Sequence, residues 1–570
     1  MNWKYRYINP ALAQNLAQEL GQPLKCGEFL TARGFANSSD ALAFMSGDLK
    51  NLPRPETLPG LNAAVAALLK ARAEKKVVAI AGDYDVDGLT STALLRRVLT
   101  DFGYEVIYRV PNRLSEGYGL SAKAVNELIA RGAGLLVTVD CGVSDFSSIQ
   151  LAVDAGLPVI VTDHHEPPPT LPKALAIVNP HLGGGWEKYP LAGVGVAFML
   201  ACGLAAALKK EGVSLKQPLI ENLALVALGT IADLAPLKGP NRLLVTHGLN
   251  FLARIAWPGI AALRARALKN KSFVTTRDVG FKLAPRLNAA GRLGQADLAL
   301  ELLMAEDPRK AKELAEILET MNRNRVRDQK DLLEDALETL ADQELESGGG
   351  RTVVLAREGW PRGLLGLVAS KVSEKTNRPT IIMSIEGDMA IGSARSVPGF
   401  NLYEALEPLR HLCLSMGGHA QAAGLRLNVD SLPRFRRALE ESAKNQPAPE
   451  PEPSLLVDML ADIGDLAVIG PHLVKMAPFG QSHPAPIAVL KNVKVLEAAP
   501  TKTGGDQHMT MRLFDGAARV NLVGFGLAPR LHEIRPSLDV AVVLDTDKFG
   551  RPEPNWRLVD FKVPAQAGAY

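Results

Sequence analysis

The sequence is poor in the features of a secreted or metal-thiolate protein. Its 570 residues include four cysteines, Cys26, Cys141, Cys202 and Cys413, which lie far apart along the chain. Because no two of them form a CxxC pair, a disulfide framework and a thiolate zinc site are both disfavoured. No apolar signal core follows the N-terminal residues 1–7, which argues against secretion. We therefore expect a cytoplasmic protein.

The chain also has no large excess of charge of either sign. Its 64 lysines and arginines against 61 aspartates and glutamates give a net charge of +3. A nucleic-acid partner would therefore be held by local basic patches and not by a global field. The length exceeds what one hydrophobic core normally organises, so we expect several domains.

Long apolar runs are nearly absent. The one uncharged stretch that approaches the length of a membrane span covers residues 191–208. It consists mostly of alanine, glycine and other small residues, so its transfer into lipid would be weakly driven. We interpret it as a buried helix entered through a glycine-rich turn, and expect no membrane partner.

The pattern of apolar residues along the chain indicates an α/β protein of several domains. Residues 1–70 look helical, and residues 71–305 then alternate short apolar runs with helical segments. The runs at 77–80, 106–108, 135–139 and 159–161 predict the strands of a parallel sheet. Leucines and other apolar residues at three- and four-residue steps predict one long connector helix within 306–350.

Two further units follow the connector. Residues 351–445 repeat an α/β pattern, and the proline-rich segment 446–454 is typical of a stiff linker. Short alternating runs over 455–565 predict a small β-domain, for which about five strands would suit an OB-like barrel.

The strongest local signal is a cluster of acids after the first strand. Asp83, Asp85 and Asp87 alternate along the chain ahead of Gly88. Three carboxylates so close repel one another unless a cation or protons intervene. A calcium loop of the EF-hand type is disfavoured because it needs a glutamate at its twelfth position, where this chain has Leu94.

Two more predicted strands end in metal-ligand types. Asp140 follows one of them, and the triplet Asp163, His164 and His165 follows the next. A lone strand-end aspartate is usually a helix cap, and a lone histidine is usually structural. Since parallel strands bring their carboxyl ends to one edge, where α/β proteins place ligands, three such endings favour one shared site. Asp233 supplies a further acid after an apolar run.

Carboxylates combined with imidazoles suit Mn²⁺ or Mg²⁺, with Mn²⁺ favoured by the histidine. Two such ions could activate water and stabilise the leaving oxygen in phosphodiester hydrolysis.

These motifs, in this order, resemble the DHH phosphoesterase superfamily. Six further segments are similar in particular to its bacterial single-strand-specific 5′→3′ exonucleases: 110–113, 116–119, 191–195, 285–292, 392–396 and 417–424. The resemblance covers roughly residues 75–430 and extends more weakly into the tail.

The resemblance implies a parallel-sheet DHH domain over 71–305, a connector helix over 306–350, a DHHA1-type substrate-binding domain over 351–445 and an OB-like nucleic-acid-binding barrel over 455–565. It implies a 5′→3′ exonuclease specific for single-stranded DNA that uses two Mn²⁺ or Mg²⁺ ions in DNA repair and recombination. A helicase and a single-strand-binding protein are the further partners to expect.

The resemblance also implies roles for individual residues. The implied metal ligands are Asp85, Asp87, Asp140, His164 and Asp233, with His165 at the scissile phosphate and Asp83 as a supporting catalytic group. The implied 5′-phosphate ligands are Arg113, Arg286, Ser393 and Arg395, and His419 could close over a phosphate. Two positions depart from the family pattern, because Ala81 and Arg362 stand where histidines are common in relatives.

Two other interpretations stay open at this point. A DHH phosphodiesterase of short oligonucleotides or cyclic dinucleotides would share the acidic motifs, but the smaller enzymes of that kind lack the extra N-terminal region and a C-terminal β-domain. A catalytically inactive DHH scaffold in replication is disfavoured because all the acids and both histidines are present.

Overall fold

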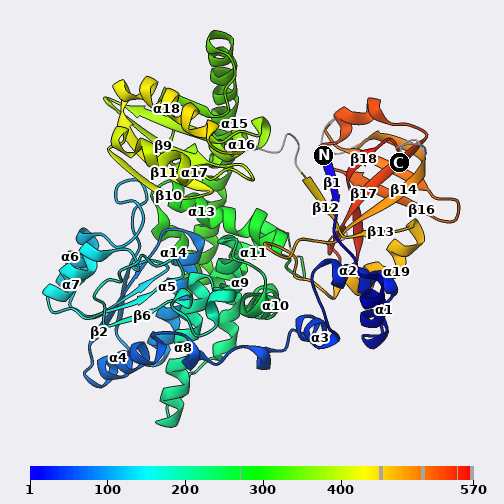
Figure 1. Cartoon of the computed structure of the whole chain (residues 1–570). Helices are drawn as coiled ribbons and strands as arrows, with labels where there is room; N and C mark the ends of the chain where they lie inside the picture. Colours follow the sequence, from blue (N-terminus) through cyan, green and yellow to red (C-terminus); the bar gives the residue numbers. More distant parts are fainter. Residues whose placement is uncertain (270, 448–453, 502–506, 548–549, 565–570) are drawn as a thin grey trace.

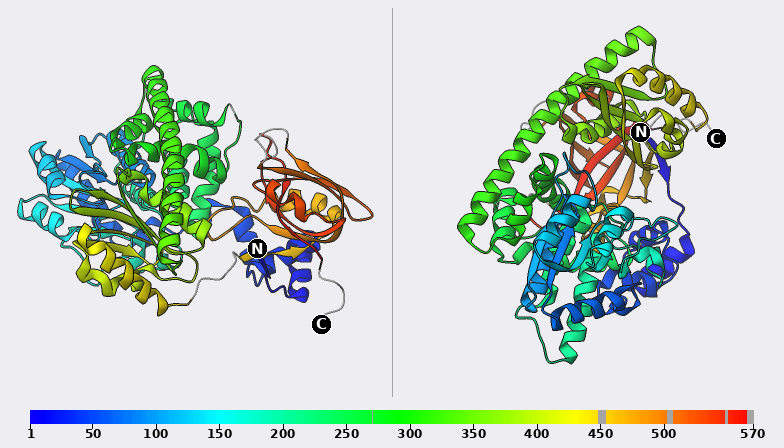
Figure 2. Two further views of the ribbon diagram at one scale, coloured as in Figure 1. Left: turned by 90° about the horizontal axis from the view of Figure 1, so that it is seen from above. Right: turned by 90° about the vertical axis from the view of Figure 1, so that its left-hand side faces the viewer.

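The computed structural model describes residues 1–269, 271–447, 454–501, 507–547 and 550–564. Its elements form a larger body, built from two α/β domains and a long helix, and a smaller body that contains both the N-terminal helices and the C-terminal barrel (Figures 1 and 2). Most of the predicted linker, residues 448–453, lies outside the described residues.

The first α/β domain is built on a five-stranded parallel sheet of order β3-β2-β4-β5-β6. Its strands are β2 Val77–Gly82, β3 Val106–Arg109, β4 Ala133–Val139, β5 Val159–Thr162 and β6 Ala176–Val178. Sequence patterning predicted the first four and missed the short β6. The chain leaves β2 for β3 on one side and returns to β4 on the other, so the carboxyl ends of β2 and β4 form a topological switch point, where such sheets bind ligands.

Helices cover both faces of this sheet (Figure 1). Apolar side chains of α6 (Ala122–Ala130) and α7 (Phe146–Asp154) cover one face. The other face packs against α4 (Leu61–Ala73), α5 (Val86–Asp101) and α8 (Gly193–Lys210), backed by α9 (Leu223–Ala232) and α10 (Gly239–Arg254). The apolar run at 191–208 is therefore a core helix, as its composition predicted: α8 would be long and apolar enough to span a membrane, but most of it is buried in this domain.

The remaining helices of this domain lead to the connector. They are α11 (Pro258–Leu268), α12 (Thr276–Asp278), the π-helical turn η6 (Val279–Leu283), α13 (Ala284–Arg292) and α14 (Ala296–Met304). The connector α15, Pro308–Ser347, is one helix of 40 residues, which corresponds to roughly 60 Å. Its first half packs on the first domain and its second half on the second domain.

The second domain has a mixed five-stranded sheet of order β10-β11-β9-β8-β7. Its strands are β7 Val353–Glu358, β8 Thr380–Glu386, β9 Met389–Arg395, β10 Ser415–His419 and β11 Ala422–Asn428, and its helices are α16 Leu365–Thr376, α17 Leu402–Leu406 and α18 Leu432–Lys444. The sheet lies between α18 with α17 on one face and α15 with α16 on the other.

The C-terminal domain is a closed barrel. Strands β14 Ile487–Pro500, β15 Met509–Phe514, β16 Arg519–Gly524, β18 Asn555–Lys562 and β17 Ser537–Asp545 pair in that order, and β17 pairs back with β14. The short strand β13 (Met459–Leu460) adds to β14, and α19 (Ile463–Val474) packs into the same core. This agrees with the OB-like barrel expected from the sequence.

The N-terminal region divides between the two bodies. Strand β1 (Asn2–Tyr5) pairs in parallel with β12 (Ser454–Val457), beside the barrel. Helices α1 (Pro10–Glu19), α2 (Leu24–Ala32) and α3 (Ser38–Ser46) share the core of the barrel, whereas α4 packs on the first domain. The expected helical region 1–70 is therefore not one unit, and it also contains a strand.

Candidate active site

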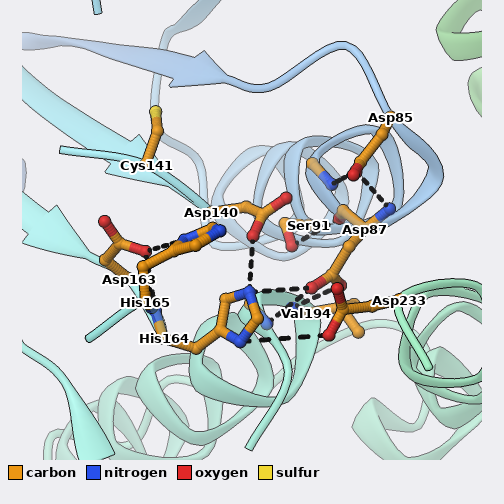
Figure 3. Close-up of polar contacts among 12 residues, drawn as sticks. Asp85, Asp87, Ser91, Asp140, Cys141, Asp163, His164, His165, Val194 and Asp233 are labelled. Atoms are coloured by element: carbon orange, nitrogen blue, oxygen red, sulfur yellow. Dashed lines mark hydrogen bonds and ion pairs between the residues drawn. The ribbon is translucent and has the colours of Figure 1, made fainter. Parts of the chain in front are cut away.

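The acidic and histidine motifs converge at the carboxyl edge of the first sheet, as Figure 3 shows. Asp83 follows β2, and Asp85 and Asp87 form the start of α5. Asp140 follows β4, His164 and His165 follow β5, and Asp233 caps the end of α9. Five different elements therefore aim ligand-type side chains at one point.

The start of α5 is fixed by side chains that satisfy its free amides. Asp85 Oδ1 accepts hydrogen bonds from the amides of Asp87 (2.9 Å) and Gly88 (3.1 Å), which is an N-cap arrangement. Asn288 Oδ1, on α13, accepts from the amide of Val86 (3.2 Å). The capping bonds leave the second carboxylate oxygen of Asp85 available to the site.

Asp87 is held by the glycine-rich turn at the start of α8. Its two carboxylate oxygens accept from the amides of Gly193 (2.7 Å) and Val194 (2.9 Å). A side chain at position 193 would collide with Asp140, because an added Cβ would lie 2.7 Å from Asp140 Oδ1. The glycine therefore lets two acids and a helix start share a small volume.

The centre has unmet ligand atoms. His164 Nε2 lies 3.1 Å from Asp140 Oδ1 and 3.8 Å from Asp87 Oδ2, while His164 Nδ1 lies 3.9 Å from Asp233 Oδ2. Nevertheless, Asp83 Oδ1, Asp140 Oδ1 and His164 Nε2 are buried with no hydrogen-bond partner among the described residues. Buried polar atoms of native proteins are normally satisfied, so this geometry fits atoms that share a cation.

The pKa values of these residues also fit a bound cation. Burial, followed by the charge of neighbouring carboxylates, raises the pKa of Asp140 well above its ordinary value, and raises the pKa values of Asp87 and Asp233 to about 7. Burial lowers the pKa of His164 and keeps its imidazole neutral, the form that binds a metal. Three overlapping sets of residues could each hold a metal ion, because in each set the ligand atoms lie within 4.8 Å of one another. These sets are Asp83, Asp85 and Asp140; Asp87, His164 and Asp233; and Asp140, His164 and His165.

Asp140 has a backbone conformation that L-residues rarely adopt. Its φ of +59° is in the left-handed region. Such conformations cost of order 1–3 kcal/mol and concentrate at functional sites. The conformation turns the Asp140 carboxylate from the end of β4 toward His164 (Figure 3).

His165 has a different environment from His164. Its Nδ1 lies 2.8 Å from Asp163 Oδ1, and the Asp163 carboxylate also accepts from the amides of Val143, His164 and His165. Burial alone would lower the pKa of His165, but the hydrogen bond and charge of Asp163 outweigh it and raise that pKa to about 9. His165 is therefore cationic at neutral pH and suited to contact a phosphate.

Tyr118 connects these elements and was not singled out by the sequence. Its hydroxyl donates to the backbone carbonyl of Asp140 (3.2 Å) and lies 3.0 Å from His165 Nδ1. The only signal for it in the sequence was its place in the segment 116–119.

A cluster of arginines lies beside the acids. A cavity of about 310 Å³ is bordered by the acids Asp83, Asp85, Asp140 and Asp233 and by Arg113 and Arg292. Burial, together with the charges of Arg113, Arg325 and Arg395, lowers the pKa of Arg292 to about 10. Within the described part of the chain, no carboxylate forms an ion pair with any of these four arginines. Their mutual repulsion fits an anion-binding site.

The structure brings together some of the predicted phosphate ligands and not others. Arg113 and Arg395 are in the cluster, and Glu116, a possible partner of Arg113, pairs with Arg109 instead (2.5 Å). Arg286, by contrast, pairs with Glu319 (2.6 Å) and donates to the Lys282 carbonyl. Arg292, at the other end of the segment 285–292, lines the cavity together with Arg113.

The second domain presents the remaining predicted residues along its sheet. Ser393 and Arg395 are two residues apart on β9 and share one face of the sheet. His419 lies on β10 in the same cross-strand row as Arg395, with Ala422 of β11 between them.

The two residues that depart from the family pattern, Arg362 and Ala81, lie outside the cavity wall. Arg362, in the 3-10 turn before α16, pairs with Glu386 at the end of β8, and Ala81 is buried in β2, where its carbonyl lies 3.8 Å from Cys141 Sγ. Neither residue contributes to the cavity wall.

Comparison with known proteins identifies the same three domains. Family models match the DHH family N-terminal domain over residues 77–230, the DHHA1 domain over 349–445 and the RecJ OB domain over 470–559. The single-stranded-DNA-specific exonuclease RecJ of Bacillus subtilis (strain 168) is 34% identical over 95% of this chain and 68% of its own length. The chain belongs to the RecJ exonuclease family. RecJ of Escherichia coli (strain K12) is 38% identical over 76% of this chain and 78% of its own.

Solved RecJ structures extend the likeness to three dimensions. RecJ of Thermus thermophilus in complex with Mn²⁺ covers 99% of this chain and 80% of its own, with a TM-score of 0.83 and 30% identity. The same protein in complex with Mg²⁺ gives a TM-score of 0.77 at 28% identity over 99% and 79% of the two chains. The cofactor class expected from the sequence is thus found in RecJ structures that share this fold.

Proposed function

We propose that this protein is a metal-dependent exonuclease that degrades single-stranded DNA from its 5′ end. The observation that carries the proposal is the single cavity in which an acid and histidine centre faces unpaired arginines. A terminal phosphate bound to the arginines would place the next phosphodiester bond toward the acids, so cleavage would release nucleotides from that end.

Two divalent ions, Mn²⁺ or Mg²⁺, would be held by Asp85, Asp87, Asp140, His164 and Asp233, with Asp83 in support. When bound, such ions supply Lewis-acid activation of water and charge stabilisation of the leaving oxygen. The chain itself positions these ligands by the cap of α5, by the amides that hold Asp87 and by the left-handed Asp140.

The protein's own groups would then bind the substrate. The cationic His165, oriented by Asp163, would donate a hydrogen bond to the scissile phosphate. Arg113, Arg292 and Arg395 would hold the terminal phosphate, with Arg325 adding charge and with Ser393 and His419 farther along the second domain. Guanidinium groups suit this task because they bind phosphate oxygens bidentately.

The rest of the strand would leave along the groove between the two bodies. This groove, about 590 Å³ in volume, begins at Leu234, beside Asp233, and ends on the barrel at Asp545 and Arg557. Leu234 and Phe281 expose 67% and 78% of their surface, and both line it. Exposed apolar and aromatic side chains are the surfaces on which unpaired bases stack. A double strand would not offer its bases in this way.

This use of single strands fits a cytoplasmic role in DNA repair and recombination. A helicase would supply the strand, and a single-strand-binding protein would cover it. The rival activity on short oligonucleotides or cyclic dinucleotides would leave the groove and the barrel without a role, and an inactive scaffold would not need the unmet ligand atoms.

Digestion of end-labelled DNA tests the proposal. Single- and double-stranded DNA labelled at the 5′ or the 3′ end would be incubated with Mn²⁺, Mg²⁺ or EDTA. The expected result is immediate release of the 5′ label as mononucleotide from single strands only, and no release in EDTA. Early release of the 3′ label, or equal attack on double strands, would contradict the proposal.

A further inference from the structure

The loop between β3 and α6, residues 110–121, carries two residues of the catalytic cavity. Arg113 and Tyr118 are five residues apart on this loop, and both line the cavity. The proposed function assigns Arg113 to the terminal phosphate and gives Tyr118 no role. Because one short loop carries both residues, a contact made by the first can affect the second.

The loop is held at both ends and in its interior. At its start, Asn112 Nδ2 donates to the Gly294 carbonyl (2.9 Å), and at its end, Asp145 Oδ2 accepts from the amide of Leu120 (2.7 Å). Between these points, Glu116 Oε1 accepts from the amide of Asn112 (3.2 Å). A loop held in this way cannot absorb a shift of one residue locally, so the shift reaches the others.

The Tyr118 hydroxyl lies between two parts of the catalytic centre. It donates to the backbone carbonyl of Asp140 (3.2 Å), and its oxygen lies 3.0 Å from His165 Nδ1. A phenol has one proton to donate, so the oxygen is left to accept from His165 Nδ1. One hydroxyl therefore joins a metal-ligand residue to the residue assigned to the scissile phosphate.

Both contacts act on groups whose orientation matters for cleavage. The left-handed Asp140 is held on one side by its amide, which donates to the Thr162 carbonyl (3.0 Å), and on the other side by Tyr118. His165 Nδ1 lies between Tyr118 and Asp163, which leaves Nε2, without a hydrogen-bond partner among the described residues, for the substrate. Misplacement of such groups by a fraction of an ångström lowers the rate of a reaction more than it lowers binding.

We propose that Tyr118 is a positioning residue that aligns His165 and Asp140 when Arg113 holds a 5′-phosphate. The inference rests on the proposed function, because it needs a terminal phosphate at the arginines. A bound phosphate would fix Arg113, the loop would then fix Tyr118, and the hydroxyl would fix the two catalytic groups. The 5′-phosphate should therefore speed cleavage within the bound complex as well as tighten binding.

Single-turnover cleavage of 5′-phosphorylated and 5′-hydroxyl single strands by the full chain in saturating Mn²⁺ tests this proposal. A series of enzyme concentrations gives the maximal rate and the half-saturating concentration for each strand. In the native protein the phosphate should raise the maximal rate roughly tenfold or more.

Tyr118→Phe removes only the hydroxyl, and since this side chain is half exposed, the variant should fold like the native protein. It should lower the maximal rate roughly tenfold on 5′-phosphorylated strands and roughly twofold or less on 5′-hydroxyl strands, as loss of a hydrogen bond that forms only in the aligned state does. The half-saturating concentration should stay within about twofold, because the arginines still bind the phosphate.

Tyr189→Phe is the matched control, because this tyrosine is similarly exposed, lies outside the catalytic cavity and makes no hydrogen bond through its hydroxyl among the described residues. A double-mutant cycle adds a second readout. Arg113→Met should slow the maximal rate on 5′-phosphorylated strands in the native protein and have little further effect in Tyr118→Phe protein, since the two residues act on one step.

An equal loss of maximal rate on both kinds of end would indicate a merely structural role for Tyr118 and would overturn the inference. So would a change confined to the half-saturating concentration, or additive effects of Arg113→Met and Tyr118→Phe. The labelled-DNA assay decides the proposed function separately. A protein that releases the 5′ label as expected but gives one of these results would lose only the inference about Tyr118.

Discussion

At the scale of single residues, the catalytic centre concentrates negative charge that the protein alone cannot neutralise. Asp140→Asn should lower turnover roughly a thousandfold or more, as loss of one member of a catalytic unit does. In EDTA the same change should raise the free energy of unfolding by roughly 1–3 kcal/mol, because it removes a buried carboxyl group whose raised pKa disfavours the folded state at neutral pH. Activity assays in saturating Mn²⁺ and thermal unfolding in EDTA check both effects.

Asp154→Asn is the control for that pair of measurements, because this aspartate is exposed on α7. Near-normal turnover of Asp140→Asn protein would remove Asp140 from the ligand set. A loss of stability in EDTA would contradict the electrostatic account.

A buried histidine in the smaller body gives a pH dependence of stability. His483 packs against Phe29, Phe44 and Phe479, and burial lowers its pKa from 6.5 to about 3. In the unfolded chain this histidine therefore binds a proton below about pH 6.5, whereas in the folded chain it stays neutral until about pH 3. At pH 4.5, which is two pH units below the ordinary pKa of histidine, this difference should lower the free energy of unfolding by roughly 2.7 kcal/mol, at about 1.4 kcal/mol per pH unit.

His483→Phe should remove this part of the acid sensitivity. The measurement is the thermal midpoint at pH 7 and at pH 4.5 for both proteins, with His532→Gln, at an exposed site, as the control. An unchanged difference between the two pH values in His483→Phe protein would show that the histidine does not carry it.

The residue scale also shows what the sequence could and could not predict. The strand-end acids were predictable because their position follows from local patterning and from the geometry of a parallel sheet. The surroundings of Arg286 were not, since they depend on Glu319 of α15, 33 residues away, which pairs with it. Tertiary packing decides which partner a side chain pairs with, and the pattern of a single sequence does not contain that information.

At the scale of elements, helix α10 joins the two bodies through one arginine. Arg242 is buried and donates to the carbonyls of Phe44, Met476, Ala477 and Pro478, which belong to the N-terminal region and to the loop before the barrel. The ion pairs Lys271–Asp547 (2.7 Å) and Arg277–Asp545 (3.1 Å) add to the same interface.

Arg242→Met should therefore loosen the smaller body from the larger. Loss of these charge-assisted hydrogen bonds should weaken docking by roughly 3 kcal/mol, since one such bond to a charged group contributes 1.5–3 kcal/mol. A larger radius of gyration in X-ray scattering and faster proteolysis between residues 446 and 454 would report it. Arg254→Met is the control on the same helix, and identical scattering curves for the two variants would contradict this role.

At the scale of the whole molecule, the N-terminal helices and the C-terminal barrel depend on each other for a shared hydrophobic core. The first three helices share a core with the barrel more than 400 residues later in sequence, a pairing that no local pattern in the sequence indicated. Deletion of 455–570 alone should expose that apolar surface and cause aggregation. Deletion of both 1–47 and 455–570 should leave a monodisperse protein.

The doubly truncated protein should also separate binding from catalysis. Its turnover on short strands should stay close to that of the full chain, whereas its affinity for long strands should fall roughly tenfold or more with the loss of stacking and charged surface. Light scattering and steady-state kinetics on strands of two lengths check this. Equal losses on short and long strands would contradict the division between the two bodies.

The whole molecule also builds the pocket for the strand end, because its arginines come from the first domain, from α13, from α15 and from β9. The most direct test is the ratio of kcat/KM for 5′-phosphorylated over 5′-hydroxyl single strands, in the native protein and in Arg395→Met, with Arg410→Met of the same domain as the control. The account predicts that Arg395→Met lowers this ratio roughly 10- to 150-fold, the equivalent of 1.5–3 kcal/mol for one charge-assisted hydrogen bond, while Arg410→Met leaves it unchanged. An equal loss of activity on both kinds of end would contradict it.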